Sequence, residues 1–222
     1  MKISHLNVHS YLAKHEYIIT DQAMARANDI CFSGTLLQPQ QQLENTFLPI
    51  KEECTIFRFD RTQTRSGDLA EGGMMIVCPS LQPIRVNIER PTQLEVVSII
   101  AHAIHSDCRM CLVTVYRRPQ QELAVFLSLL GNYLANLPQM VPTIIVGDFN
   151  EDLLSRLTSS RILKLMSSRG FSQLVQVPTT DSGSLLDHIY YNGITEDAVV
   201  DVIDTIRTMM PHICPSHILL YR

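Results

Sequence analysis

Two polar residues, Asp148 and Asn150, close an apolar stretch of the chain, TIIVGDFN (143–150). An apolar run of this length predicts a buried β-strand. Side chains two residues apart on a strand share a face, so we expect Asp148 and Asn150 to point the same way. Strand ends are positions where rigid folds present catalytic groups. The alternative is a turn in which both residues only satisfy backbone groups.

Three further stretches place polar side chains at the ends of predicted strands. Asn7 ends the first strand in HLNVHS, Tyr116 ends another in VTVYRRP, and Asp187 precedes the apolar residues of LLDHIYY. Each residue taken alone has a structural explanation as a turn, cap or edge residue. Together with Asp148 and Asn150, they predict one shared cleft.

These stretches, in this order, resemble the endonuclease/exonuclease/phosphatase superfamily, and more closely the apurinic-endonuclease-like domains of non-LTR retrotransposons. The motifs HLNV, YRRP, GDFN and LLDHIYYN carry the resemblance, which spans nearly the whole chain. It implies an α/β fold, a four-layer α/β sandwich of two face-to-face mixed β-sheets flanked by helices. It also implies a Mg²⁺-dependent DNA endonuclease that hydrolyses phosphodiester bonds and that was ancestrally fused to a reverse transcriptase.

The resemblance assigns catalytic roles to the residues at the strand ends. Asp148 would act as the general base that orients and deprotonates the attacking water. Asn150, Tyr116 and Asn7 would hydrogen-bond phosphate oxygens or water, with Asn7 beside the metal. Asp187 would orient a histidine that contacts the same phosphate.

Contacts to the DNA backbone are also expected from this resemblance. Thr180 is a candidate, as is Arg117. Arginines that could position phosphates, or simply be solvated, are Arg58, Arg61, Arg65, Arg117 and Arg118. The net charge of −4 argues against a strongly basic, non-specific nucleic-acid binder, although it leaves room for a local basic patch.

One metal ligand of the family is missing from the sequence. Relatives carry Ser/Thr-Glu-Thr-Trp-Leu after the second strand, whereas this chain has SGTLL, with Gly34 at the glutamate position. Mg²⁺ prefers oxygen ligands, commonly one or two carboxylates. We therefore expect weak or absent Mg²⁺ binding.

The end of the chain also departs from the family. A coding string for the family's Tyr-Tyr-Ser-Asp-His, read one base later, gives Thr-Ile-Arg-Thr-Met, which is the sequence at 205–209. We therefore interpret residues 1–204 as the domain and residues 205–222 as an out-of-frame or degenerate tail, with an incomplete last strand. In the competing interpretation, Ser216 and His217 replace the family's Asp and His, and ILLYR forms the final strand. The nucleotide sequence across this stretch decides between the two.

The bulk properties suit one sizeable globular domain. The chain has 222 residues, of which 45% are hydrophobic and 18% charged. No 18-residue apolar run predicts a membrane span, and MKISHLNVHS lacks a signal-peptide core, so we expect an intracellular protein, nuclear or cytoplasmic. Cys108 and Cys111 form a lone CxxC without the second ligand pair that a zinc site needs.

Periodicity and turn residues place the secondary structure. Helices are predicted over Tyr17–Asn28, 120–137 and Ser159–Arg169. Strands are predicted over 2–10, 29–34, 54–61, 73–79, 94–103, 110–119, 142–150, 185–192 and 198–204.

The sequence thus favours a retrotransposon-type DNA endonuclease with impaired or lost activity. A non-catalytic remnant that binds nucleic acid or phosphate is one alternative. A phosphatase of the same superfamily is another. Repair of both losses, by Gly34→Glu and a restored Ser-Asp-His ending, is expected to recover nicking of DNA.

Overall fold

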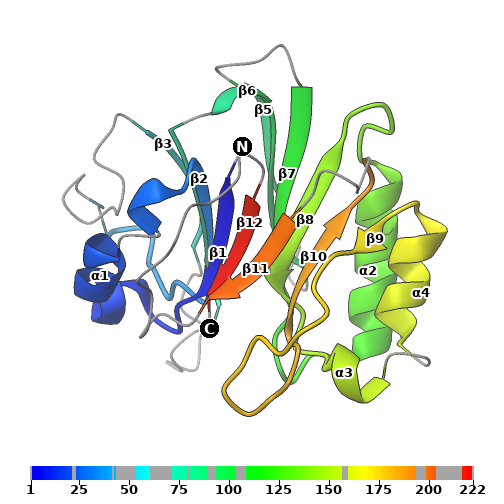
Figure 1. Ribbon diagram of the computed structural model, residues 1–222. Helices are drawn as coiled ribbons and strands as arrows, with labels where there is room; N and C mark the ends of the chain where they lie inside the picture. Colours follow the sequence, from blue (N-terminus) through cyan, green and yellow to red (C-terminus); the bar gives the residue numbers. More distant parts are fainter. Residues whose placement is uncertain are drawn as a thin grey trace.

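The described residues of the computed structural model form two β-sheets that face one another, with helices on both outer sides (Figure 1). Each sheet has six strands, so the predicted four-layer α/β sandwich is confirmed. The structure describes residues 2–21, 24–41, 43, 54–60, 72–79, 81–89, 94–103, 109–156, 160–193, 199–203 and 217–221.

The first sheet has the strand order β11-β12-β1-β2-β4-β3. Strand β1 runs parallel to both β2 and β12, and β4 runs antiparallel to β2 and β3. The strands are β1 (Ile3–Asn7), β2 (Asp29–Ser33), β3 (Thr55–Phe59), β4 (Met74–Cys78), β11 (Val199–Ile203) and β12 (His217–Tyr221).

The second sheet has the strand order β5-β6-β7-β8-β10-β9. Strands β7 and β8 are parallel, and every other pair in this sheet is antiparallel. The strands are β5 (Leu81–Glu89), β6 (Glu95–Ala103), β7 (Arg109–Tyr116), β8 (Thr143–Asp148), β9 (Ser172–Gln173) and β10 (Asp187–Tyr191).

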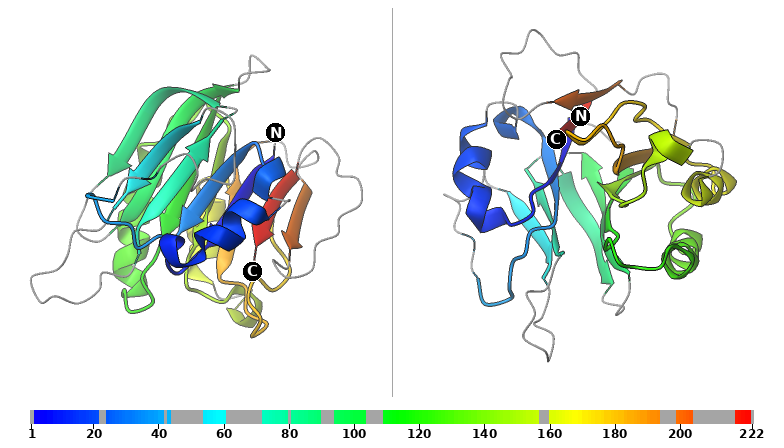
Figure 2. Two further views of the ribbon diagram at one scale, coloured as in Figure 1. Left: turned by 90° about the vertical axis from the view of Figure 1, so that its left-hand side faces the viewer. Right: turned by 90° about the horizontal axis from the view of Figure 1, so that it is seen from below.

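Alternate side chains along the strands divide the core into three parts. Ile3, Leu112, Val146 and Ile189 lie in the buried cluster between the sheets. A second cluster lies between the first sheet and α1, and a third between the second sheet and α2 and α4, as the two views of Figure 2 illustrate. A residue that lies an even number of positions from a member of the inner cluster on the same strand therefore faces the space between the sheets.

The helices cover the outer faces. They are α1 (Tyr11–Thr20), the 3₁₀ helix η1 (Met24–Arg26), α2 (Leu123–Ala135), α3 (Leu153–Arg156) and α4 (Arg161–Ser168). The predictions over 120–137 and Ser159–Arg169 are confirmed by α2 and α4. Ser160 caps α4, because its hydroxyl accepts a hydrogen bond from the Leu163 amide at 3.2 Å. None of the described helices has the length and apolarity needed to cross a membrane.

The helix predicted over Tyr17–Asn28 is wrong in position. The observed α1 begins at Tyr11, whose ring is fully buried and packs edge-on against Phe32 with ring centroids 5.1 Å apart. Asp21 lies after this helix rather than in its first turn. Its carboxylate accepts a hydrogen bond from the Met24 amide at 2.9 Å and so opens the separate turn η1.

Two strands, β5 and β9, were absent from the sequence prediction. Strand β5 contains Pro83, which lacks an amide hydrogen, and the pairing with β6 shifts between Pro83 and Arg85. Strand β9 is only two residues long.

The expectation of an incomplete last strand is corrected by β12, which pairs with both β1 and β11. The 13 residues at 204–216 lie outside the described residues, and a connection of about a dozen is enough for a parallel crossover. The out-of-frame interpretation of 205–222 stays a prediction.

Gly147 offers a direct test of this packing. A Cβ at this position would lie 1.8 Å from the Val115 carbonyl oxygen of the neighbouring strand, so the backbones would have to separate. We expect Gly147→Ala to reduce the free energy of unfolding by about 3 kcal/mol or more. Chemical denaturation monitored by circular dichroism provides the measurement.

Gly183→Ala is the matched control. Gly183 also has a positive φ, 85°, but a Cβ there would meet no atom within 4 Å. It should cost only about 1 kcal/mol, the strain of a left-handed alanine. Equal losses for the two variants would contradict the close approach of β7 and β8.

Candidate active site

Four polar side chains lie side by side across the second sheet. In the strand pairing, Glu95 is opposite Tyr116, Tyr116 is opposite Asp148, and Asp148 is opposite Asp187. We call these four residues the polar row. Each of the four either belongs to the inner apolar cluster or lies two residues from a member of it on the same strand, so all four face the first sheet. Tyr116, Asp148 and Asp187, predicted to share a cleft, are thus brought together.

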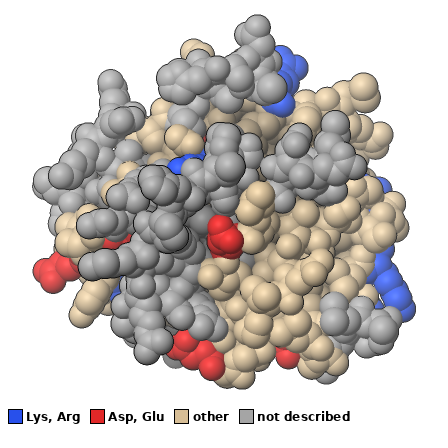
Figure 3. Space-filling model, viewed as in Figure 1, with Lys and Arg blue, Asp and Glu red and all other residues tan. Residues whose placement is uncertain are grey.

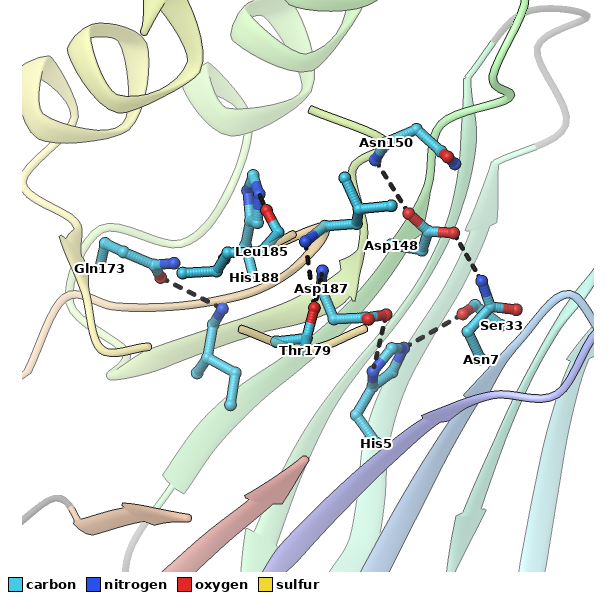
Figure 4. Close-up of polar contacts among 12 residues, drawn as sticks. His5, Asn7, Ser33, Asp148, Asn150, Gln173, Thr179, Leu185, Asp187 and His188 are labelled. Carbon is cyan, nitrogen blue, oxygen red and sulfur yellow. Dashed lines mark hydrogen bonds and ion pairs between the residues drawn. The ribbon is translucent and has the colours of Figure 1, made fainter. Parts of the chain in front are cut away.

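The first sheet contributes the opposite wall (Figure 4). The side-chain amide of Asn7 donates a hydrogen bond from Nδ2 to Asp148 Oδ2 at 2.5 Å. His5, two residues earlier on β1, places Nδ1 3.7 Å from Asp187 Oδ1. Its Nε2 lies 3.2 Å from the Ser33 hydroxyl on β2. The site therefore exists only where the two sheets meet.

His5 was missed by the sequence prediction. The signal was available, because His5 and Asn7 are two residues apart on one strand and must share a face. His5 is fully buried, so its imidazole lies beside the Asp187 carboxylate without being exposed to a ligand.

The predicted histidine partner, His217, is not brought to the site. Strand β12 is parallel to β1 with Ile218 opposite Ile3, so the His217 backbone begins β12 at the level of residue 2. Five residues of strand, about 16 Å, separate that level from Asn7. Ser216 lies outside the described residues.

Thr179, rather than its neighbour Thr180, positions Asp187. The buried Thr179 hydroxyl accepts hydrogen bonds from the Asp187 amide at 3.1 Å and the Leu186 amide at 3.0 Å. The Thr180 hydroxyl instead contacts the Ser184 backbone and the Ser182 hydroxyl within its own loop. Thr180 as a contact to DNA stays a prediction.

Asn150 does not share a strand face with Asp148, so that prediction is wrong. Strand β8 ends at Asp148, and Asn150 has a φ of 49°, which breaks the alternation. The Asn150 amide donates from its backbone to Asp148 Oδ1 at 2.9 Å, and its side chain donates to the Arg117 carbonyl at 2.7 Å. Asn150 therefore fixes the orientation of the carboxylate through its backbone.

Arg117 is buried and stabilises the turn after β8. Its three guanidinium nitrogens donate to the carbonyl oxygens of Phe149, Asn150 and Gln121 at 2.5–2.7 Å. Burial lowers its pKa, an effect opposed by the nearby carboxylates. These contacts hold the guanidinium against the turn, and Arg117 as a contact to DNA stays a prediction.

His188, another residue the sequence did not single out, holds the same turn from the other side. Its ring stacks on Phe149 with centroids 4.7 Å apart, and Nε2 lies 2.9 Å from the Glu151 carbonyl oxygen.

Burial and mutual repulsion shape the electrostatics of the site. Desolvation raises the pKa of Asp148 to about 6, although hydrogen bonds from Asn150 and Asn7 and the Arg117 charge lower it in part. Desolvation and the Asp148 charge raise the pKa of Asp187 well above its ordinary value. Burial lowers the pKa of His5 to about 3, so its imidazole is neutral. Asp148 is therefore largely ionised at neutral pH, whereas the raised pKa of Asp187 makes that carboxyl easier to protonate.

The residues around Gly34 do not make a complete magnesium site. Asp148 and Asp187 supply two carboxylates, and Asn7 Oδ1 is a buried oxygen without a hydrogen-bond partner among the described residues. Gly34 adds no ligand, and no group of three or more His, Cys, Asp and Glu side chains in the described part of the chain is arranged to hold a metal.

Simple restoration of that glutamate is obstructed by the backbone. Gly34 has a φ of +64°, and a Cβ there would lie 2.5 Å from Asn7 Oδ1. A glutamate would therefore have to strain a left-handed backbone, at about 1–2 kcal/mol, and displace the Asn7 amide. Repair by Gly34→Glu alone is not expected to rebuild the site.

The remaining candidates lie elsewhere. Arg58 on β3 pairs with Asp60 and donates to the carbonyl oxygens of Gln38 and Gln41, away from the polar row. Arg61, Arg65 and Cys108 lie outside the described residues, and Cys111 is a buried free thiol.

Solved structures share this architecture over most of the chain. A protein of the endonuclease/exonuclease/phosphatase family from Leptotrichia buccalis has a TM-score of 0.60 at 14% identity, covering 86% of this chain and 87% of its own. The chain has the endonuclease/exonuclease/phosphatase fold. The endonuclease domain of the telomere-specific non-LTR retrotransposon TRAS1 also gives 0.60, at 15% identity, covering 84% of this chain and 82% of its own.

A phosphatase shares the fold equally well. The mannosyl-6-phosphatase Bt3783 of Bacteroides thetaiotaomicron has a TM-score of 0.59 at 11% identity, covering 86% of this chain and 83% of its own. No family sequence model and no curated relative matches the chain. The comparisons therefore establish the fold of nucleases and phosphatases, within which Asp148 and its neighbours must define the chemistry.

The raised pKa of Asp148 predicts a pH-dependent stability change. An ordinary aspartate ionises near pH 3.8, whereas Asp148 ionises at about pH 6 in the folded chain. The folded state therefore holds its proton more tightly, and the stability that Asp148 contributes is lost as pH rises from about 4 to 6. With a chelator present, Asp148→Asn should raise the free energy of unfolding by about 1–3 kcal/mol at pH 8 and by far less at pH 4.

Asp152→Asn is the control of opposite sign. Hydrogen bonds from the Leu185 and Leu154 amides lower the pKa of Asp152. Its stabilising effect is present above the ordinary pKa of a carboxyl, so Asp152→Asn should destabilise at pH 8. Denaturant titrations at both pH values measure these changes. A gain from Asp148→Asn that is equal at pH 4 and pH 8 would contradict the assignment.

Proposed function

We propose that this chain is a nucleic-acid-binding member of the fold, derived from a non-LTR retrotransposon endonuclease, whose hydrolytic activity is impaired. One observation carries the proposal: Asn7, Tyr116, Asp148 and Asp187 meet between the sheets, beside Gly34. These are the residue types that the resemblance requires around a phosphodiester. The likeness to the TRAS1 endonuclease domain supports the same choice.

The residues present can bind and orient a phosphate and its attacking water. Asp148 is held by Asn7 and the Asn150 backbone, and its pKa of about 6 leaves it largely ionised at neutral pH. An ionised carboxylate with both oxygens oriented can accept a proton from water. The Tyr116 hydroxyl and the Asn7 amide are neutral groups that can donate hydrogen bonds to phosphate oxygens.

Two losses explain the impaired hydrolysis. Gly34 lacks a carboxylate that would attract a divalent cation, and His5, the histidine beside Asp187 among the described residues, is fully buried and does not reach a ligand position. Charge on the phosphate in the transition state is then poorly offset. Because catalytic groups act as a unit, the loss of two of them is expected to cost many orders of magnitude in rate.

The surface charge agrees with local rather than general binding of DNA. Lys and Arg side chains of the described residues lie at separate positions on the face shown in Figure 3 and do not gather into one basic patch. With a net charge of −4, binding must depend on groups at the site. A phosphatase acting on small phosphoesters is the second candidate, favoured by the shared fold of the mannosyl-6-phosphatase.

Tyr116→Phe tests whether the site binds DNA. Removal of the hydroxyl should weaken binding to a short DNA duplex roughly three- to tenfold, since one hydrogen bond to a charged phosphate is lost. Fluorescence anisotropy in the presence of a chelator measures affinity, and supercoiled plasmid with Mg²⁺ measures nicking. We expect the unsubstituted chain to bind DNA with little or no nicking.

Tyr133→Phe is the matched control, because Tyr133 lies on α2 and is buried against the opposite face of the second sheet. It should leave DNA affinity unchanged. Efficient nicking by the unsubstituted chain would contradict the impairment. Hydrolysis of inositol phosphates in preference to abasic DNA would favour the phosphatase instead.

A further inference from the structure

Glu95, at the far end of the polar row from Asp187, is a buried carboxylate that the proposed function does not use. Only 2% of the residue is exposed. Its Oε2 accepts a hydrogen bond from the Gly73 amide of the opposite sheet at 3.2 Å, and its Oε1 accepts one from Arg118 Nε at 2.8 Å. A buried charge is costly unless it is paired, and Arg118 supplies the pairing charge.

Arg118 differs sharply from its neighbour Arg117. The Arg118 side chain is 42% exposed, and its ion pair with Glu95 engages only Nε. A guanidinium has five N–H donors, so one bond through Nε leaves the terminal nitrogens. No hydrogen bond joins these terminal nitrogens to other residues within the described ranges. Glu95 therefore holds Arg118 through Nε, while the side chain remains partly exposed to solvent.

The position of Glu95 fixes where this guanidinium lies. Strand β6 carries Glu95, and one strand, β7 with Tyr116, separates it from Asp148 on β8. Two strand spacings amount to about 10 Å. A guanidinium held at Glu95 is therefore displaced from Asp148 along the polar row, toward a phosphate next to the one beside Asp148 on a nucleic-acid strand.

The geometry points to Arg118 as a second phosphate-binding site, which binds a DNA phosphate adjacent to the one that Tyr116 and Asn7 hold beside Asp148. Glu95 is the residue that positions it. This inference rests on the proposed function and narrows it, because a small phosphoester with a single phosphate has no group to place at Arg118. A planar, fixed guanidinium is well suited to the paired oxygens of a phosphate.

Arg118→Gln tests the inference through the salt dependence of binding. The probe is a fluorescein-labelled DNA duplex, titrated with the full chain by anisotropy at several KCl concentrations with a chelator present. Loss of one phosphate contact should lower the slope of log affinity against log salt by about 0.9 and weaken binding roughly three- to tenfold. Arg118→Lys, which keeps the charge, should retain most of the slope.

Two comparisons make the outcome specific. Arg109→Gln is the matched control, because Arg109 is an exposed arginine at the opposite end of the same strand, and it should change neither slope nor affinity. Inorganic phosphate as a competitor should displace the probe equally well from Arg118→Gln and the unsubstituted chain. Circular dichroism confirms that each variant is folded.

The outcomes separate this inference from the proposed function. If the unsubstituted chain shows no salt-dependent binding of the duplex, both are rejected. If the unsubstituted chain binds but Arg118→Gln keeps the same slope and affinity, the assignment of Arg118 is overturned and the proposed function stands. If Arg118→Gln weakens competition by inorganic phosphate instead, Arg118 belongs to the first phosphate position and the two-phosphate geometry is wrong.

Discussion

Two neighbouring carboxylates, Asp148 and Asp187, are buried between the sheets, and the cost of burying them constrains the structure around them. Each is raised in pKa by desolvation, and Asp187 also by the charge of Asp148. The first sheet compensates Asp148 with the Asn7 amide and brings His5 beside Asp187, so neither sheet could present this site alone. Apolar packing between the sheets therefore has a second role, since it holds these polar partners together.

The strand ends could be read from the sequence because they depend on local patterns. Apolar runs that finish at Tyr116 and Asp148 predict where rigid strands present polar groups, and the sheet brings them into register. Asn150 failed the same reasoning, because its left-handed φ of 49° turns the chain after the strand. The structural role of Arg117 was not predictable in this way, because its guanidinium satisfies three backbone carbonyls, a tertiary arrangement that sequence spacing does not encode.

Glycines occupy two positions at this site where a Cβ atom would clash with neighbouring atoms. Gly147 allows β7 and β8 to approach closely, which puts Asp148 and Tyr116 opposite one another. Gly34 has a left-handed φ of +64° against the Asn7 amide, so that a Cβ there would lie 2.5 Å from Asn7 Oδ1. The backbone at this position therefore favours glycine. Under the proposed function, this is the position at which a metal-binding carboxylate is missing.

The contact between Asn7 and Asp148 is the most direct test of this account, because it joins the two sheets at the site. A double-mutant cycle combines Asn7→Ala and Asp148→Ala and measures the free energy of unfolding by urea titration at pH 8. A hydrogen bond to a charged group predicts a coupling energy of about 1 kcal/mol or more between the two positions. Additivity within about 0.3 kcal/mol would show that the two side chains do not meet.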